Sequence, residues 1–284
     1  MKTLITALVL CTISIAMNVC AEDRFPKVEI RTEQVSENIY VLFGAGGNIG
    51  VLNGPDGILM IDDQYAPLAE KIRAALGKLG HKTPTYVLNT HYHGDHTGSN
   101  ADFGVNSIIM AHDNVRVRLL AGDSENSALP VITFATEAKV HFNNQETHLI
   151  HMPAGHTDGD AIVYFPSANV IHLGDHFFKD RFPYIDLKAG GTVRGLIDNI
   201  VNIISRIDAD TKIIPGHGEM ATQVDLQRYL VMLKTTSQFI DAQLAQGMSE
   251  QAILAAGLDP QWDSWGSGFI NQERWLKTLI ESKK

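Results

Sequence analysis

The segment His91-Tyr92-His93-Gly94-Asp95-His96 limits what this chain can fold into more than any other. It follows an apolar run at residues 85–89, which predicts a buried strand, and it precedes Thr97-Gly98, which favours the start of a helix. Imidazole and carboxylate groups are costly to bury unless they are paired or bound to a metal ion. Four such groups in six residues therefore predict a metal site, and their alternation suits two ions better than one.

Three further segments repeat this pattern of an apolar strand followed by a glycine turn with a ligating residue. They are Gly155-His156-Thr157 after residues 148–151, Gly174-Asp175-His176 after 170–173, and Pro215-Gly216-His217-Gly218 after 212–214. Ligands in α/β folds bind at the carboxyl ends of strands, on turns that glycine permits. Together with the first segment, the four places predict one shared site.

The rest of the chain alternates between predicted strands and helices. An antiparallel meander is expected first, then a helix with apolar residues at helical spacing from Leu68 to Leu79, and a long final helix capped by Thr222 and Asp225. The predicted strands are residues 28–31, 39–43, 50–53, 58–62, 85–89, 107–110, 138–142, 148–151, 161–165, 170–173 and 212–214, and the main helices 112–120, 193–204 and 226–244. We expect one α/β domain over residues 22–284, with two sheets packed between helices.

Residues 1–21 have the pattern of a secretory signal peptide. Lys2 precedes an apolar run at residues 4–16, and Val19 and Ala21 are small residues placed for cleavage before Glu22. The apolar run is short for a membrane span, so a stable membrane anchor is not expected. A retained anchor and a lipoprotein cut at Cys20 are the alternatives. Secretion across the inner membrane into the periplasm is the predicted localisation.

The amino-acid composition limits the class of protein, its partners and its metal ligands. With 44% hydrophobic and 19% charged residues, the chain is expected to be globular rather than disordered. The cleaved chain would carry 22 basic and 32 acidic residues, a net charge of −10, and no basic patch, so nucleic acid is not an expected partner. Both cysteines, Cys11 and Cys20, would leave with the signal peptide. The predicted site is therefore made of nitrogen and oxygen ligands.

The ordered motifs H-x-H-x-D-H, Gly-His-Thr, Gly-Asp and Pro-Gly-His-Gly resemble those of the metallo-β-lactamase superfamily, over roughly residues 37–245. The resemblance implies an αββα sandwich, with two mixed β-sheets flanked by helices. It also implies His91, His93 and His156 as ligands of a first metal ion, and Asp95, His96 and His217 as ligands of a second. Asp175 would bridge the two ions as in glyoxalase II-like members. Asp62, in the early acidic motif, would orient a ligand histidine.

Three histidines with an open coordination position are typical of catalytic zinc. We expect two Zn²⁺ ions, although iron or manganese also suits such ligands. Zinc makes hydroxide available near neutral pH, and that hydroxide would attack a carbonyl while Asp95 orients it and relays its proton.

Departures from true β-lactamases shape the expected substrate. One lactamase subclass uses a cysteine that the cleaved chain lacks, and typical lactamases lack the bridging aspartate. Glyoxalase II itself fits poorly with an export signal. We expect an exported hydrolase of a small β-lactam, lactone or (thio)ester, with lactam cleavage as a promiscuous activity. The alternatives are a phosphodiesterase and a non-catalytic periplasmic zinc-binding protein. The oligomeric state stays open.

Some residues outside the motifs carry weaker expectations. Lys179 and Arg181 could hold a substrate carboxylate or phosphate, or simply form a solvated loop. Residues 44–48 are expected to form a hairpin turn beside the site, because no helix follows them to bind phosphate. Trp262, Trp265, Trp275, Phe269 and Ile270 are expected to cover the core, with a role in lining the substrate site or in an oligomer as the alternatives.

Overall fold

The computed structural model describes residues 25–284, so the predicted signal peptide and both cysteines lie outside the described residues. Its twelve strands are β1 (Arg31–Gln34), β2 (Ile39–Phe43), β3 (Ile49–Gly54), β4 (Gly57–Ile61), β5 (Tyr86–Leu88), β6 (Ile108–His112), β7 (Ile132–Phe134), β8 (Glu137–Phe142), β9 (Gln145–His151), β10 (Ala161–Phe165), β11 (Val170–His172) and β12 (Lys212–Ile214).

The α-helices are α1 (Ala69–Gly77), α2 (Gly94–Thr97), α3 (Asn100–Gly104), α4 (Asp113–Ala121), α5 (Val193–Arg206), α6 (Gln223–Ala245), α7 (Glu250–Ala256) and α8 (Gln272–Glu281). The 3-10 helices are η2 (Ala66–Leu68), η3 (Asn126–Ala128), η4 (Pro166–Ala168), η5 (Gly174–His176), η6 (Leu187–Ala189) and η7 (Pro260–Ser267). Among residues 25–284, no helix has the length and apolar character needed to cross a membrane.

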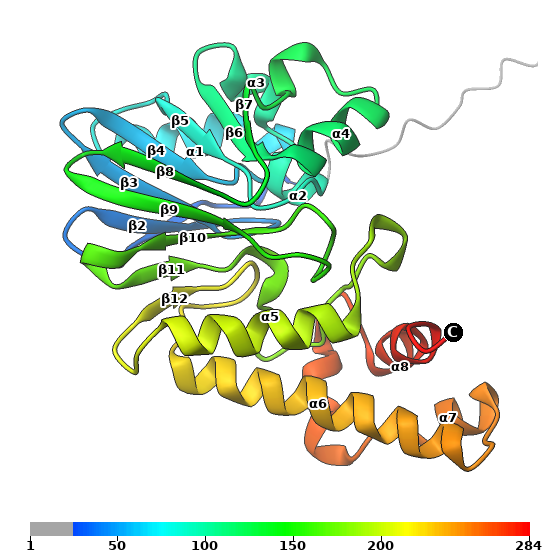
Figure 1. Cartoon of the computed structure of the whole chain (residues 1–284). Coiled ribbons are helices and arrows are strands. Elements are labelled where there is room, and N and C mark those ends of the chain that lie inside the picture. Colours follow the sequence, from blue (N-terminus) through cyan, green and yellow to red (C-terminus); the bar gives the residue numbers. More distant parts are fainter. Residues whose placement is uncertain (1–24) are drawn as a thin grey trace, which may run out of the picture.

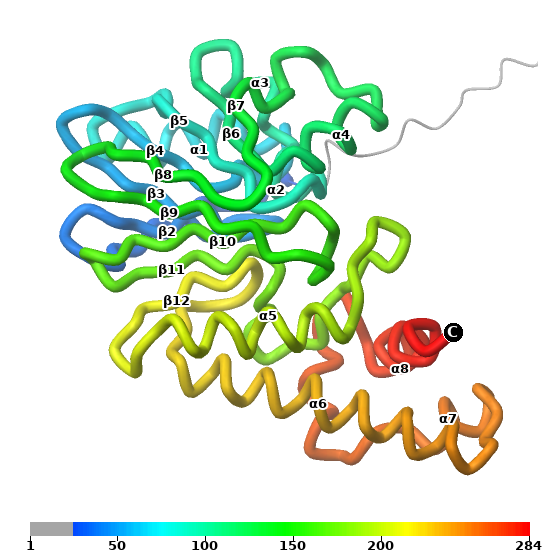
Figure 2. The backbone as a smooth tube through the Cα atoms, viewed as in Figure 1, coloured from blue at the N-terminus to red at the C-terminus, as the bar shows by residue number. Residues whose placement is uncertain are grey.

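Two mixed sheets form the centre of the molecule (Figure 1). The first has the order β1-β2-β3-β4-β5-β6-β7, antiparallel as far as β4 and parallel from β4 to β7. The second has the order β12-β11-β10-β9-β8, and only β11 and β12 pair in parallel. The first half of the chain builds one sheet and the second half builds the other (Figure 2).

The three largest buried clusters hold the layers together. One lies between the sheets and draws on both, as with Leu59 of β4 and Val163 of β10. A second packs α1 on the outer face of the first sheet through Ile72 and Leu76. The third and largest packs α5, α6 and the C-terminal segment on the outer face of the second sheet. The αββα sandwich is thereby confirmed.

Several helices and strands form at the residues where local sequence patterns predicted them. Strands β2, β10 and β12 occupy the predicted residues, and α6 begins with a capping box in which Thr222 and Asp225 bond each other's backbone N–H. The prediction of a first strand at residues 28–31 is wrong by three residues, because the pairing with β2 starts at Arg31. Strand β7 was not predicted, because its three residues, which follow Pro130, are too few to show a period in hydrophobicity.

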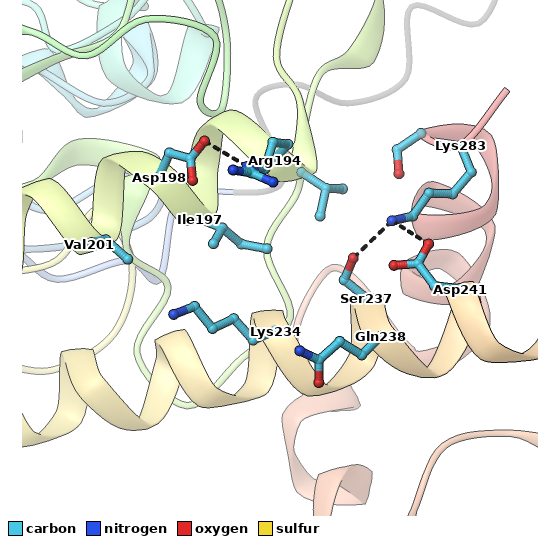
Figure 3. Close-up of a pocket in the computed structure, with 11 residues that line it drawn as sticks. Arg194, Ile197, Asp198, Val201, Lys234, Ser237, Gln238, Asp241 and Lys283 are labelled. Atoms are coloured by element: carbon cyan, nitrogen blue, oxygen red, sulfur yellow. Dashed lines mark hydrogen bonds and ion pairs between the residues drawn. The ribbon is translucent and has the colours of Figure 1, made fainter.

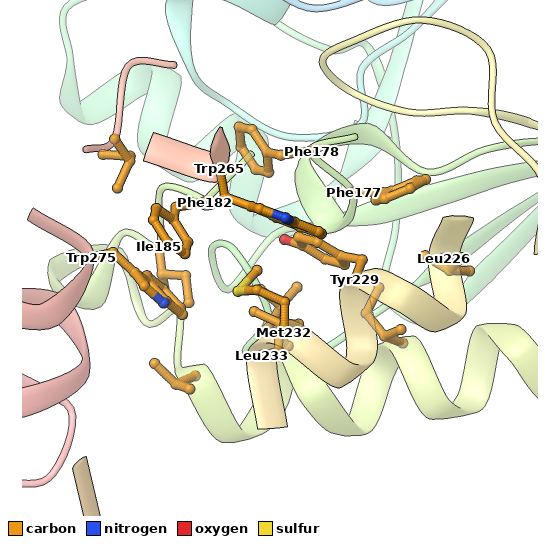
Figure 4. Close-up of a cluster of buried hydrophobic side chains, with 14 of the residues drawn as sticks. Phe177, Phe178, Phe182, Ile185, Leu226, Tyr229, Met232, Leu233, Trp265 and Trp275 are labelled. Carbon is orange, nitrogen blue, oxygen red and sulfur yellow. The ribbon is translucent and has the colours of Figure 1, made fainter. Parts of the chain in front are cut away.

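The C-terminal aromatic residues pack against α6, as Figure 4 shows. Trp265 stacks on Tyr229 of α6 with ring centroids 6.3 Å apart, and Trp275 stacks on Phe182 at 5.9 Å. Trp262, Trp265, Trp275 and Ile270 are buried, as expected of residues that cover the core. The same expectation is wrong for Phe269, which is 76% exposed.

Candidate metal centre

The turns that follow four strands bring the predicted ligands together. The turn after β5 and helix α2 carry His91, His93, Asp95 and His96, and the turns after β9, β11 and β12 carry His156, Asp175 and His217. Turns from both halves of the chain, and so from both sheets, thereby meet at one place. All seven predicted ligands lie there, in two groups.

The first group consists of His91, His93 and His156. Nε2 of His156 lies 2.8 Å from Nδ1 of His93 and 3.2 Å from Nε2 of His91, and His91 Nε2 lies 3.1 Å from His93 Nδ1. Burial lowers the pKa of His91 well below its ordinary value and that of His156 to about 4. Both imidazoles are therefore neutral at physiological pH, which is the form that binds metals.

The second group consists of Asp95, His96 and His217. Nε2 of His217 lies 3.4 Å from Oδ2 of Asp95, and Nε2 of His96 lies 3.8 Å from the same oxygen. Burial lowers the pKa of His96 and of His217, but the neighbouring carboxylates outweigh it. The pKa of His96 is raised well above its ordinary value, and that of His217 is raised to about 9. A cation bound here would take the place of those protons.

Asp175 lies between the two groups and faces both. Its Oδ2 is 3.4 Å from Nε2 of His156, and its Oδ1 is 3.1 Å from Nε2 of His96 and 3.3 Å from Nε2 of His217. Burial favours the neutral acid, but His217, His96 and His156 outweigh it and hold the pKa of Asp175 well below its ordinary value. One ionised carboxylate thus offers one oxygen to each group.

Hydrogen bonds at the far side of the rings fix which nitrogen faces the centre. Nδ1–H of His96 donates to Oδ2 of Asp62 at 2.7 Å, and Asp62 is itself held by the backbone N–H and hydroxyl of Thr90. The Thr90 hydroxyl oxygen in turn accepts from Nδ1–H of His91 at 3.2 Å. Nε2 of both rings therefore faces the site, in the manner of ligand histidines with an orienting carboxylate.

The segment after Phe182 orients two further histidines of the centre. This role of the segment was not predicted from the sequence. The Tyr184 carbonyl accepts from Nδ1–H of His156 at 2.7 Å, and Oδ2 of Asp186 accepts from Nε2–H of His93 at 3.1 Å. Tyr92 donates to the same Asp186 oxygen at 2.7 Å. Asp186 lies 93 positions from His93 and belongs to no motif, so no local signal could have identified it.

Asp160 is a second missed residue, and it shapes the turn that carries His156. Its carboxylate accepts from the backbone N–H groups of His156 and Thr157, at 2.7 and 2.8 Å. The signal available in the sequence was its place in Gly155-His156-Thr157-Asp158-Gly159-Asp160. His176 points away from the centre, and its Nε2 accepts from the Asn199 amide at 3.0 Å.

Residues 44–48 form the hairpin turn between β2 and β3, as expected, and the turn closes over the site. Asn48 donates to the carbonyl oxygens of Pro215 and Gly218 at 2.9 and 2.8 Å, which ties this turn to the one carrying His217. Gly47 lies so close to His96 that any Cβ atom would overlap the imidazole. Only glycine fits there without moving a predicted ligand.

Replacing Gly47 by Ala should weaken metal binding at the second group by about 10- to 100-fold, the range seen when a ligand loses its orientation. The added methyl would displace His96 from the line set by Asp62. The measurement is a zinc titration against a competing chelator. Gly122→Ala is the matched control, because its Cβ would meet its nearest atoms at ordinary distances of 3.5 and 3.6 Å. Equal zinc affinity in both variants would contradict the prediction.

A cavity of about 560 Å³ opens onto the centre. His93, Asp95, Asp175 and His217 form its floor, and its remaining lining includes Gly44, Gly46, Tyr65, Phe178, Arg181, Phe182, Tyr184, Phe269 and Ile270. Arg181 is the only arginine within residues 25–284 whose guanidinium has no intramolecular hydrogen bond or ion pair. It is therefore available to an anion in the cavity.

Lys179, the other expected anion-binding residue, is engaged elsewhere. Its ammonium donates to the Met220 carbonyl at 2.6 Å and lies 3.5 Å from Oδ2 of Asp225. It does not line the cavity, so the structure does not bring its ammonium together with the other expected site residues.

A second cavity, of about 500 Å³, lies between α5, α6 and the C-terminal residues (Figure 3). None of the predicted site residues lines it. Of its three cations, Arg194 and Lys283 are paired with Asp198 and Asp241, and the third is Lys234.

Buried polar atoms without hydrogen-bond partners show that the two groups fit metal ions. Nε2 of His96 and Oδ1 of Asp175 are buried and have no hydrogen-bond partner of good geometry, a condition that costs free energy unless something else satisfies them. Imidazole nitrogens 2.8–3.2 Å apart also repel through their lone pairs unless a cation lies between them. The residues present therefore fit metal ions held by nitrogen and oxygen ligands.

Comparison with known proteins agrees with this geometry. The sequence model of the metallo-beta-lactamase superfamily matches residues 43–217. A hydroxyacylglutathione hydrolase of Rhodospirillum rubrum is 35% identical over 39% of this chain and 41% of its own length. A metallo-beta-lactamase type 2 of a Bacillus species is 23% identical over 78% of this chain and 92% of its own. The chain spans less than half the length of the first two curated relatives it matches.

The fold is shared with solved structures as well. A metallo-beta-lactamase from Pontibacter korlensis superposes with a TM-score of 0.64 over 72% of this chain and 99% of its own, at 16% identity. The family match covers more than half of the chain and includes all seven residues of the centre. This chain belongs to the metallo-β-lactamase superfamily.

Proposed function

We propose that this protein is a dinuclear zinc hydrolase that cleaves the acyl C–N, C–O or C–S bond of a small β-lactam, lactone or (thio)ester after export to the periplasm. The observation that carries the proposal is the position of Asp175, whose two oxygens face two separate groups of ligands at 3.1–3.4 Å. His91, His93 and His156 would hold one ion, Asp95, His96 and His217 the other, and Asp175 both. The pattern of a secretory signal peptide in residues 1–21 supports export.

Bound zinc would supply Lewis acidity and a water molecule of lowered pKa. Asp95 lines the cavity floor, and its side chain is 22% exposed, whereas Asp175 is buried. Asp95 is therefore the carboxylate of the centre that can accept a proton from water in the cavity. Its Oδ2 lies against Nε2 of His217 and His96, which fixes the direction of that oxygen.

The cavity favours a carbonyl compound over a phosphodiester chain. Aromatic side chains make up much of its wall, and Arg181 is the one cation among its lining residues besides the histidines of the centre. The net charge of −9 also opposes approach of a polyanion. The named relatives, a hydroxyacylglutathione hydrolase and a metallo-beta-lactamase, support a small carbonyl substrate.

The test is a panel of substrates with the metal content measured on the same protein. The panel comprises a chromogenic cephalosporin, a lactone, a thioester and bis(p-nitrophenyl) phosphate. Two zinc ions per chain with turnover of a carbonyl substrate is the expected result. One metal per chain would reject the dinuclear assignment, and turnover of the phosphodiester alone would make the protein a phosphodiesterase. Two bound ions with no turnover would favour a zinc-binding protein.

Replacing Arg181 by Ala should raise KM for an anionic substrate by about tenfold while leaving kcat nearly unchanged. An exposed cation that meets one substrate charge contributes uniform binding of roughly this size. Lys179→Ala is the matched comparison and should leave KM unchanged, because its ammonium is held by Met220 and Asp225. Steady-state kinetics on a carboxylated lactam and on its methyl ester decide the point. Equal KM changes for both substrates would remove the proposed role of Arg181.

A further inference from the structure

Part of the cavity wall comes from outside the segment that matches the superfamily. That match ends at residue 217, whereas Phe269 and Ile270 lie between η7 and α8 and line the cavity. Phe269 is 76% exposed, the most exposed large hydrophobic residue described. A single exposed apolar residue is ordinary, but this one lies at the opening of a cavity above a hydrolytic centre.

The position of Phe269 is fixed by its neighbours. Arg274 donates from Nη1 to the Phe269 carbonyl at 3.0 Å, and its guanidinium lies 5.2 Å from the phenyl centroid. The preceding helix η7 is anchored, because the backbone N–H of Phe182 donates to the Trp265 carbonyl at 3.0 Å. Phe269 therefore forms a fixed rim at the opening of the cavity, and a fixed side chain loses little conformational freedom when a ligand binds to it.

Aromatic rings connect this rim to the first group of ligands. Phe269 meets Tyr184 edge to face, with centroids 6.2 Å apart and planes at 82°. Tyr184 then lies 5.7 Å from the His93 ring and 5.8 Å from the His156 ring. Tyr184 is itself 37% exposed. A group attached to a carbonyl next to His93 and His156 would thus lie against Tyr184 and reach Phe269.

We propose that Phe269 and Tyr184 form a subsite for an apolar, preferably aromatic, acyl substituent of the substrate. The inference rests on the proposed hydrolase function and adds the class of acyl group that the enzyme selects. Aromatic pairs in edge-to-face or offset geometry stabilise binding beyond the area they bury. The charge of Arg181 lies at the same rim, because its side chain runs alongside Gly268.

The test compares acetyl and phenylacetyl thioesters of N-acetylcysteamine, which share one leaving group. In the unchanged protein, kcat/KM should be about tenfold higher for the phenylacetyl thioester, and Phe269→Ala should reduce that ratio to about one to three, in line with the size of aromatic contacts. Val105→Ala removes an equally exposed side chain, 70% accessible, that does not line the cavity, and it should leave the ratio unchanged.

A binding measurement separates this proposal from the hydrolase proposal. Phenylacetate should bind more tightly than acetate in calorimetric titration, and Phe269→Ala should abolish the difference. If neither these thioesters nor any carbonyl compound of the substrate panel is hydrolysed but this difference is present and depends on Phe269, the hydrolase proposal fails and the subsite stands. Equal binding of both acids overturns the subsite, as does a phenylacetyl-to-acetyl ratio that Phe269→Ala leaves unchanged. A dimer that dissociates in Phe269→Ala, with no change in either ratio, would assign the residue to an interface instead.

Discussion

Replacing Asp175 by Asn should remove metal from both groups of ligands and lower kcat/KM by about 10³-fold or more, because the charge that serves both groups is lost. Asn keeps the shape of the side chain, but its neutral amide carries no negative charge. That charge would be lost beside His96 and His217, which lie 3.1 and 3.3 Å from Oδ1. Metal content by elemental analysis and kinetics on the best substrate are the measurements.

The companion variant Asp95→Asn makes this prediction specific. Asp95 belongs to the second group alone, so its replacement should cost one ion and leave the other bound. Asp198→Asn, an exposed carboxylate paired with Arg194 on α5, is the control for removal of an acidic charge. If Asp175→Asn and Asp95→Asn lose the same single ion, Asp175 does not bridge the two groups. Circular dichroism should show the same secondary structure in all three variants.

Replacing Trp275 by Ala should lower the free energy of unfolding by about 3–5 kcal/mol, the usual range for deleting a fully buried large aromatic side chain. Trp275 is 0% exposed, and its ring stacks on Phe182 at 5.9 Å. Its Nε1–H also donates to the Thr236 hydroxyl of α6 at 3.1 Å. The substitution leaves a cavity between α6, α8 and the segment that follows η5.

Urea denaturation of the purified protein measures this change, with the slope of the transition checked so that altered compactness is not mistaken for stability. Lys277→Ala on the exposed side of α8 is the matched control, because its surface pair with Glu273 contributes little. A loss below about 1 kcal/mol for Trp275→Ala would show that α8 is not part of the cooperative core.

The layered fold could be predicted well from the sequence where local signals are strong. The alternating or continuous apolar runs at 39–43, 161–165 and 212–214 became β2, β10 and β12, and Thr222 with Asp225 marked the start of α6. Strand β7 and helix α3 escaped prediction because three to five residues carry no measurable period. The first strand shifted because its register depends on its partner β2, which sequence alone does not give.

The supporting residues of the site were harder to foresee. Asp62 could be predicted to orient a histidine, and it lies 2.7 Å from His96. Asp186 could not, because it reaches His93 across 93 positions with no motif around it. Lys179 and Arg181 are two residues apart and looked equivalent in the sequence, yet one is held by Met220 and Asp225 and the other lines the cavity.

The sequence by itself determined the chemical character of the centre: five histidines and two aspartates on turns after strands, with no cysteine beyond residue 20. Ligand type and turn glycines are local properties, so they can be read along the chain. The tertiary structure alone decided that Asp175 offers one oxygen to each group, that Asp186 and the Tyr184 carbonyl orient two of the histidines, and that Phe269 lies at the cavity rim rather than in the core. These contacts join residues far apart in the sequence, and only the packing of the two sheets and the C-terminal segment brings them within reach.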